Sequence, residues 1–211
     1  FTNGETFRIG NPEPVVYLAR LFISQDFKLK NDRNIQVVIG KFGLADYFDF
    51  NTYSHDPRVH FMNWSLMAQG SWDYAANTRG YTSGIYAAYS HPKFTVRGSF
   101  TAVPTSANGP DLDYHYDQAN GINVEFEKPF KVNESYTGVI RMLAFQNRAG
   151  MGNYDLANAQ AGTKPDITLS RSPFRTKRGW GINAELTHKD LWGAFARLGW
   201  NDGKNETWAF T

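Results

Sequence analysis

The sequence contains no cysteine among its 211 residues. This absence excludes disulfide frameworks and thiol catalysis, and it is compatible with both cytosolic and exported bacterial proteins. No consecutive apolar run approaches the ~20 residues that a transmembrane helix needs, so no such helix is expected. The formal net charge is only +2, which gives no indication of a nucleic-acid partner.

Aromatic residues, in contrast, are abundant at 16%, and the chain has 19 glycines. Its mean hydropathy of −0.50 is typical of a soluble protein. A membrane β-barrel gives a similar average, because its lipid-facing and lumen-facing residues alternate along each strand. Hydropathy therefore does not separate these two classes, and the pattern along the chain has to decide.

Alternation of apolar and polar residues predicts eight strands and the start of a ninth. The clearest strand is 93–102, where Phe94 and Val96 share one face while Arg97 and Ser99 share the other. The expected strands are 15–29, 35–40, 81–90, 93–102, 122–127, 136–145, 180–187, 192–200 and 207–211.

The connections between these strands alternate between short and long. The long ones are 43–79, 104–118 and 148–178. An antiparallel meander with tight turns at one end and long loops at the other is typical of an outer-membrane barrel. The alternative is a soluble β-sandwich, but its water-facing side should carry many Lys and Glu residues. Here the polar face carries Thr, Ser, Asn, Gly and single Arg or Glu residues, which suits a narrow aqueous lumen.

The connection of residues 43–79 is too long for an ordinary loop and too aromatic to remain solvated. We expect it to fold inward and narrow the lumen. Within it, Phe61, Trp64 and Leu66 are spaced loosely as in a helix, which predicts a short helix there.

Two carboxylates in this connection could also be interpreted as a glycosidase pair, with nearby aromatic residues as a sugar platform. The candidate carboxylates are Asp46, Asp49, Asp56 and Asp73, and the candidate aromatics are Trp64, Trp72 and Tyr74. Nothing in the spacing fixes two carboxylates at a defined separation, and Asp is a common turn residue. His55 and His60 have no helical spacing and no third ligand, so no metal site is expected.

Arginines on the polar face of the strands are candidates for solute contact, because a guanidinium can donate to several sugar hydroxyls. They are Arg20, Arg97, Arg141 and Arg197. The alternative is that these arginines pair with Glu125, Glu127 and Glu185 across strands. For the arginines on the strands, the sequence does not decide between contact with solute and pairing across strands. For Arg58, the Asp-Pro-Arg turn among aromatics favours contact with solute.

Long motifs then identify a family resemblance. The stretch GKFGLADYFDFNTYSHDPRVHFMNWSLMAQGSWDYAANTRGYTSG is similar to the signature region of the carbohydrate-selective porins of Gram-negative outer membranes, the OprB type. Further matches are YLARLFISQDF, RGWGINAEL and ARLGWNDGKNETWAFT. The resemblance implies an all-β, antiparallel transmembrane barrel of about 16 strands. On that basis, residues 1–211 are expected to be the N-terminal half, or an incomplete part, of one barrel domain, covering about 8 to 9 of those strands.

The expected function is an outer-membrane porin for passive or facilitated diffusion of mono- and oligosaccharides, in contact with outer-membrane lipid, as a monomer or a homotrimer. No catalytic residue, cofactor, metal or nucleic acid is expected. The alternatives are an outer-membrane glycan-acting enzyme and a soluble sugar-binding β-sandwich. The residues expected to line the pore are Arg58, Asp56, Trp64, Trp72, Asp73, Arg79, Arg20, Arg97, Arg141 and Glu125.

Overall fold

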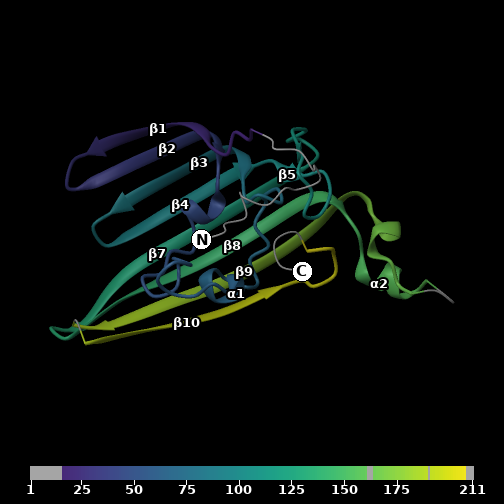
Figure 1. Ribbon diagram of the computed structural model, residues 1–211. Coiled ribbons are helices and arrows are strands. Elements are labelled where there is room, and N and C mark those ends of the chain that lie inside the picture. The colour runs from purple at the N-terminus through teal and green to yellow at the C-terminus, as the bar shows by residue number, and fades with distance from the viewer. Residues whose placement is uncertain (1–15, 161–163, 190, 208–211) are drawn as a thin grey trace.

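The computed structural model describes residues 16–160, 164–189 and 191–207 (Figure 1). Its main element is one eight-stranded sheet in the order β1-β2-β3-β4-β7-β8-β9-β10, in which all neighbours are antiparallel. The strands are β1 Leu21–Leu29, β2 Arg33–Phe42, β3 Thr82–His91, β4 Phe94–Thr101, β7 Asn120–Asn133, β8 Tyr136–Met151, β9 Ser172–His188 and β10 Trp192–Asn201. The predicted meander is therefore confirmed.

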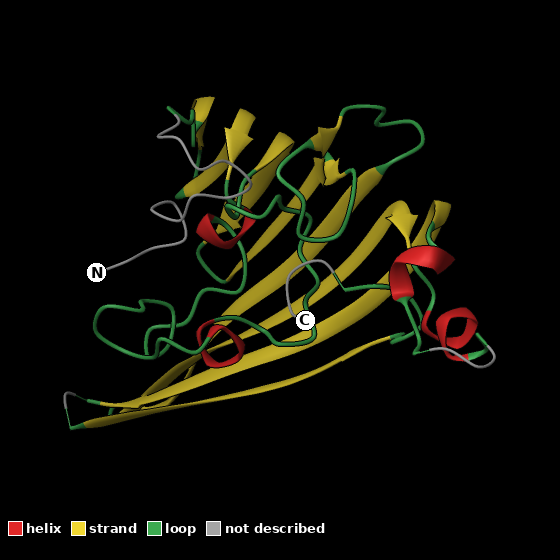
Figure 2. Cartoon of the chain, turned by 45° about the vertical axis from the view of Figure 1, so that its right-hand side comes forward, coloured by secondary structure: helices red, strands yellow, loops and turns green. Residues whose placement is uncertain are grey.

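The sheet curves around the connection that follows β2, as Figure 2 shows. Strands β1 and β10 lie at its two edges and pair with β2 and β9 respectively, so the sheet is not closed within the described residues. A small second sheet joins β5 (Val103–Pro104) to β6 (Leu112–Asp113). The eight strands thus form a single layer, and the described residues do not form the two packed sheets that the alternative, a soluble β-sandwich, requires.

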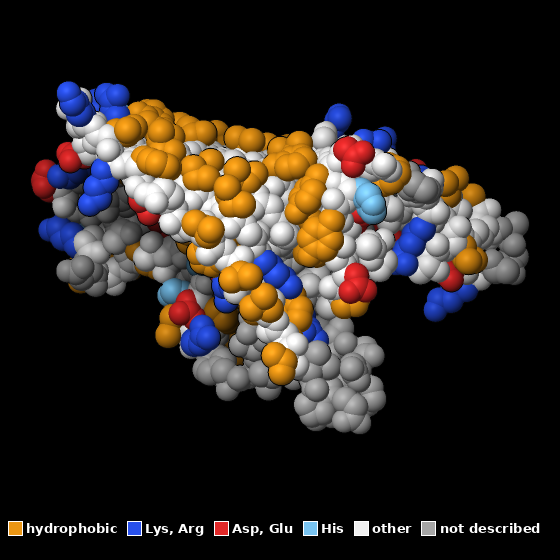
Figure 3. All heavy atoms as spheres, turned by 90° about the horizontal axis from the view of Figure 1, so that it is seen from above, with side chains coloured by type: hydrophobic (Ala, Val, Ile, Leu, Met, Phe, Trp, Pro, Cys, Tyr) orange, Lys and Arg blue, Asp and Glu red, His pale blue; other side chains and the backbone are white. Residues whose placement is uncertain are grey.

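The predicted alternation holds in the structure, with the polar face turned inward. On β4, Arg97 and Ser99 are buried, whereas Val96 and Phe100 are each 38% exposed. On β7, Asn123 is buried while Val124 is 51% exposed. In Figure 3, hydrophobic side chains gather in a broad band across the sheet, with Lys and Arg side chains near its margins. This distribution is the reverse of that in a soluble sheet and matches the alternation expected for a barrel in lipid.

The tight turns follow from local chemistry. Asn31 and Asp32, between β1 and β2, have positive φ values of 60° and 54°, and Asn and Asp tolerate this conformation better than other residues with a side chain. The resulting hairpin aligns Ile23 with Ile39 and Leu29 with Arg33. This register places Ile23 and Phe27 of β1 on the same face as Ile39 and Ile35 of β2.

Several predicted boundaries were wrong. Strand β1 begins at Leu21, not at residue 15. Residues 148–151 and 172–178, expected in a loop, continue β8 and β9, where Arg148 pairs with Thr176. The extension of β9 carries polar residues on both faces, so it lacks the alternation that marks the rest of that strand. Most of the expected ninth strand, residues 208–211, lies outside the described residues.

The described helices are short. The expected helix appears as α1, Trp64–Met67, where the Asn63 side chain accepts a hydrogen bond from Ser65 N and caps the first turn. A second helix, α2 (Tyr154–Asn158), was not predicted and is capped in the same way by Asn153. The 3₁₀ turns are Leu44–Asp46 and Ile167–Ser170. In the described parts of the chain, no helix is long and apolar enough to cross a membrane.

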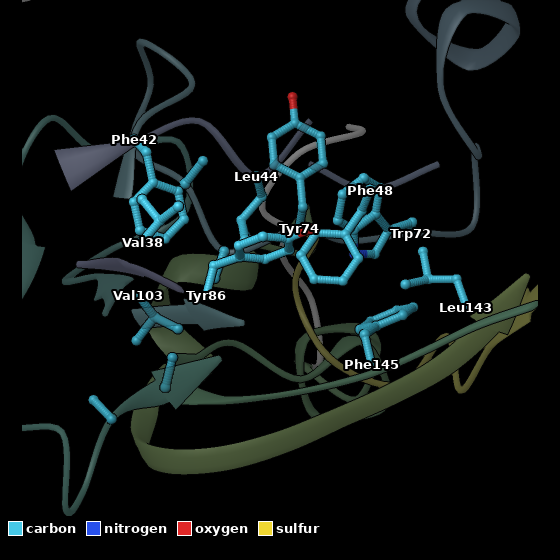
Figure 4. Close-up of a cluster of buried hydrophobic side chains, with 14 of the residues drawn as sticks. Val38, Phe42, Leu44, Phe48, Trp72, Tyr74, Tyr86, Val103, Leu143 and Phe145 are labelled. Atoms are coloured by element: carbon cyan, nitrogen blue, oxygen red, sulfur yellow. The ribbon is translucent and has the colours of Figure 1, made fainter. Parts of the chain in front are cut away.

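The hydrophobic core lies between the sheet and the connection from β2 to β3 (Figure 4). From the connection, Phe48 and Trp72 are fully buried, with ring centroids 5.9 Å apart. Phe48 also packs edge-on against Tyr86 of β3. This part of the connection therefore packs on the concave side of the sheet.

Candidate functional site

The connection of residues 43–81, hereafter the inserted loop, has two parts with different exposure. Its base, residues 43–54 and 67–81, is mostly buried against the inward face of the sheet. Residues 57–66 are all exposed. We call residues 55–66 the tip. The base positions this tip over the concave face of the sheet.

Inward-pointing side chains of the sheet hold the base through its backbone. Glu125 of β7 accepts a 2.8 Å hydrogen bond from Asp49 N, and Glu185 of β9 accepts one of 2.7 Å from Thr52 N. Asn123 of β7 accepts a 2.8 Å hydrogen bond from the Trp72 indole. Because these acceptors come from two strands, the loop is fixed at several points along its length.

The same carboxylates take part in an ionic ladder across four strands. Arg97 of β4 lies 2.7 Å from Glu125 and 3.1 Å from Glu127. Arg141 of β8 lies 2.8 Å from Glu127 and 3.4 Å from Glu185. Both arginine side chains are only 7% exposed, so little guanidinium surface is left for a solute. For these two arginines, the geometry matches the alternative of cross-strand pairing.

The structure places three further predicted residues where the base meets the sheet. Arg20 forms an ion pair with Asp46, at 3.0 Å, and lies over the ring of Tyr81. Arg79 lies over the ring of Tyr17, 4.1 Å from its centroid. Asp73 is buried beside Lys177 of β9, with 3.2 Å between the charged atoms, and its backbone carbonyl accepts from Asn147.

Two predicted tryptophans occupy opposite environments. Trp72 has no exposed surface, so its indole belongs to the core and is not open to a solute. Trp64, at the start of α1, is 55% exposed. Trp72 is buried because it lies in the base, and Trp64 is exposed because it lies in the tip. The residue type alone does not reveal this difference in exposure.

The tip carries three accessible residues of the predicted set: Trp64, Asp56 and Arg58. The side chains of Asp56 and Arg58 are 46% and 62% exposed and approach to 3.9 Å. The Asp56 carboxylate also accepts a 2.7 Å hydrogen bond from Arg58 N, which fixes the Asp-Pro-Arg turn. The tip thus presents a cation, an anion and an aromatic face, which are groups that can contact hydroxyl-rich solutes.

The predicted set missed one residue at the centre of the base. Asp49 is 1% exposed and accepts hydrogen bonds from Gln69 N and from the Asn183 side chain, each at 2.6 Å. Burial raises the pKa of Asp49 above its ordinary value, and the neighbouring Arg197 opposes part of that shift. The sequence around Asp49 does not indicate that this residue is buried. The only related signal was that Asn183 and Arg197 lie on the polar face of their strands, which turns inward.

Two of the four acidic residues considered as a glycosidase pair are withdrawn from solvent. Asp49 and Asp73 are each only 1% exposed and cannot reach a glycan. Among the described residues, no group of three or more His, Asp or Glu side chains could hold a metal ion.

Comparison with known proteins gives one match. A family model described as "Carbohydrate-selective porin, OprB family" matches residues 2–211. No curated protein and no solved structure matches the chain.

Proposed function

Because the chain belongs to the carbohydrate-selective porin family of the OprB type, we propose that it forms part of an outer-membrane channel for passive or facilitated diffusion of sugars. Porins are transport channels rather than enzymes, and the family supports sugars as the solutes. In such a channel, solutes are selected by pore size and by weak contacts that do not trap them.

The observation that carries this proposal is the inserted loop, fixed on the inward face with an exposed tip. In a closed barrel, the tip would project into the lumen and narrow it. Arg58 would donate to sugar hydroxyls, Asp56 would accept from them, and Trp64 would offer an aromatic face. These contacts are individually weak and exchange readily with water, as passive diffusion requires.

The open sheet supports a second part of the proposal. Strands β1 and β10 each have an unpaired edge within the described residues. Lipid does not tolerate unpaired backbone groups, so further strands must close the sheet. We propose that residues 1–211 are the N-terminal half of one barrel of about 16 strands, with the inserted loop as its constriction.

The ionic ladder has a supporting role in this channel. Arg97 and Arg141 alternate with Glu125, Glu127 and Glu185, so the charges of the wall largely compensate one another. A wall without a strong field of one sign suits neutral solutes better than a lining of unpaired charges would. The wall arginines thereby organise the channel, while the tip contacts the solute.

The test is the Arg58→Ala substitution in the full-length protein that contains this chain, reconstituted into liposomes and planar bilayers. We expect slower uptake of neutral monosaccharides at low concentration, because a hydroxyl donor is lost. Ion conductance should stay similar or rise, because the smaller side chain widens the pore. Arg33→Ala is the matched control, since Arg33 is exposed at the β1–β2 turn, at the opposite end of β2 from the inserted loop. Equal sugar uptake by both variants would contradict a solute-binding role for Arg58.

A further inference from the structure

We propose that Asp49 and Arg197 form a buried staple that holds both stems of the tip against the sheet. They are positioning residues: they act on the solute only through the placement of the tip. The importance of this placement for sugar passage rests on the proposed function, whereas the staple itself is a separate property of the structure.

The first half of the staple is Asp49, which joins separate parts of the loop to the wall. Its backbone N–H donates to Glu125 of β7, and its carboxylate accepts from Asn183 of β9. The same carboxylate accepts from the backbone N–H of Gln69, on the return arm of the loop, at 2.6 Å. Asp49 thus binds the outgoing arm, the return arm and the sheet at one point.

The backbone at Asp49 is adapted to this role. Its φ of 55° is in the left-handed region, which Asp and Asn adopt more easily than other residues with a side chain. This restriction leaves asparagine as the conservative replacement.

The second half of the staple is Arg197, which lies on β10 with its side chain 7% exposed and 3.2 Å from the Asp49 carboxylate. Its guanidinium donates to Ser54 Oγ at 2.8 Å, to the carbonyl of Leu66, and to the carbonyl of Met67 at 3.3 Å. Ser54 directly precedes the tip, while Leu66 ends it and Met67 directly follows. One guanidinium therefore joins the two chain segments that flank residues 55–65.

Arg197 differs in this respect from the other buried arginines of the wall. Arg97 and Arg141 form ion pairs with glutamates on neighbouring strands. The side-chain hydrogen bonds of Arg197, in contrast, all go to the inserted loop within the described part of the chain. A planar, multiply donating guanidinium can serve a carboxylate, a hydroxyl and the three carbonyls of Asp49, Leu66 and Met67 together. The carbonyls of Leu66 and Met67 lie at the C-terminal end of α1, where a cation is also favoured by the exposed carbonyl groups.

The absence of native cysteine allows a direct test by site-directed spin labelling of the full chain. Val59, 72% exposed in the tip, is replaced by cysteine and labelled, and the mobility of the label is read from its electron paramagnetic resonance spectrum. In the otherwise unchanged protein, we expect restricted motion of the label. Arg197→Gln should add a mobile component to the spectrum, and Arg197→Lys should recover only part of the restriction.

Asp49→Asn provides a second variant if Arg197→Gln fails to fold. Asparagine retains the left-handed backbone and an acceptor oxygen but removes the ion pair, so an intermediate mobility is expected. Arg171→Gln is the matched control, because it breaks an arginine–carboxylate pair with Glu206, outside the inserted loop. It should leave the label spectrum unchanged.

Two outcomes separate the staple from the proposed function. An unchanged label spectrum in folded Arg197→Gln or Asp49→Asn would overturn the staple, whatever the protein transports. A mobile label with unchanged sugar permeation would support the staple and contradict the role of the tip in selecting sugars. A mobile label together with reduced sugar selectivity is the result expected from both proposals.

Discussion

The indole nitrogen of Trp72 donates a 2.8 Å hydrogen bond to the amide oxygen of Asn123. Trp72 lies on the return arm of the inserted loop, and Asn123 points inward from β7. The indole is fully buried against Phe48 and Tyr74, with ring centroids 5.9 and 5.2 Å away. The loop therefore supplies part of the core of the fold and is not a flexible appendage to it.

This contact predicts a strong dependence of stability on Trp72. Trp72→Ala should destabilise the protein by ~3–5 kcal/mol, since a large buried side chain is lost and a cavity remains. Trp64→Ala is the matched control, and its effect should stay within ~0.5 kcal/mol because the Trp64 side chain is largely exposed. Denaturant unfolding of the detergent-solubilised full chain, followed by circular dichroism, measures both. Comparable losses for the two variants would contradict the division into base and tip.

A second prediction concerns the ionic ladder. Arg97→Met should destabilise the protein by ~3–5 kcal/mol, because it leaves the buried Glu125 carboxylate without its cation. Arg141→Met should have a smaller effect, since Glu127 keeps Arg97 and Glu185 keeps its hydrogen bonds from Thr52.

Adding Glu125→Gln to Arg97→Met supplies the control for this prediction. Glutamine is neutral and can still accept the hydrogen bond from Asp49 N, so the double variant should recover part of the lost stability. Equilibrium unfolding of the single and double variants gives the coupling between the two residues. If the changes in unfolding free energy of the two single substitutions simply add in the double variant, the Arg97–Glu125 pair is not the source of the lost stability.

Much of the sheet could be predicted from the sequence, because each strand obeys a period of two that local residues specify. Arg97 and Val96 were assigned to opposite faces from parity alone, and the structure agrees. The extensions of β8 and β9 were missed for the same reason. There, paired residues such as Arg148 and Thr176 carry no apolar alternation, and only backbone pairing reveals the strand.

The site was harder to predict, because its geometry depends on contacts between distant segments. Arg197 reaches Asp49 across 148 positions of the sequence, and no local pattern announces that contact. Trp64 and Trp72 are eight positions apart and chemically identical, yet one is exposed and the other buried. Parity could place a side chain on the inward face, but it could not say whether a solute or the inserted loop would cover it.

A third prediction concerns pH. Burial by itself would raise the pKa of Glu206, but hydrogen bonds from Arg171 and from Gly152 N, with the charge of Arg171, lower this pKa below its ordinary value of 4.5. A carboxyl with a lowered folded pKa contributes stability above its unfolded pKa and loses that contribution as pH falls through the folded pKa. The contact of Glu206 with residues 152 and 171 should therefore be intact at neutral pH and lost in acid, once the pH falls below the ordinary pKa of a glutamate.

Hydrogen exchange of the segment near Gly152 measures this change, after correction for the intrinsic pH dependence of exchange. Protection of the Gly152 amide should fall in acid, while amides in the middle of β8 keep theirs. In Arg171→Gln the protection should already be reduced at neutral pH. An acid response identical in Arg171→Gln and in the unchanged protein would show that another group controls this segment.

The last prediction compares the accessibility of two long connections from outside the cell. The connection between β8 and β9 exposes Leu156 and Leu169, whose exposed fractions are 53% and 76%. The tip of the inserted loop exposes similar cleavage sites, with Trp64 at 55% and Leu66 at 45%. If the tip narrows the lumen of a closed barrel as we propose, it would lie where a protease of ordinary size cannot enter.

Chymotrypsin added to intact cells should therefore cut after Leu156 or Leu169 and spare Trp64 and Leu66. Mass spectrometry of the recovered fragments identifies the bonds that are cut. Protein unfolded by heat before digestion is the control, and it should be cut in both connections, because the same peptide bonds are then equally accessible. Rapid cleavage next to Trp64 in intact cells would place the tip outside the lumen and contradict its role as a constriction.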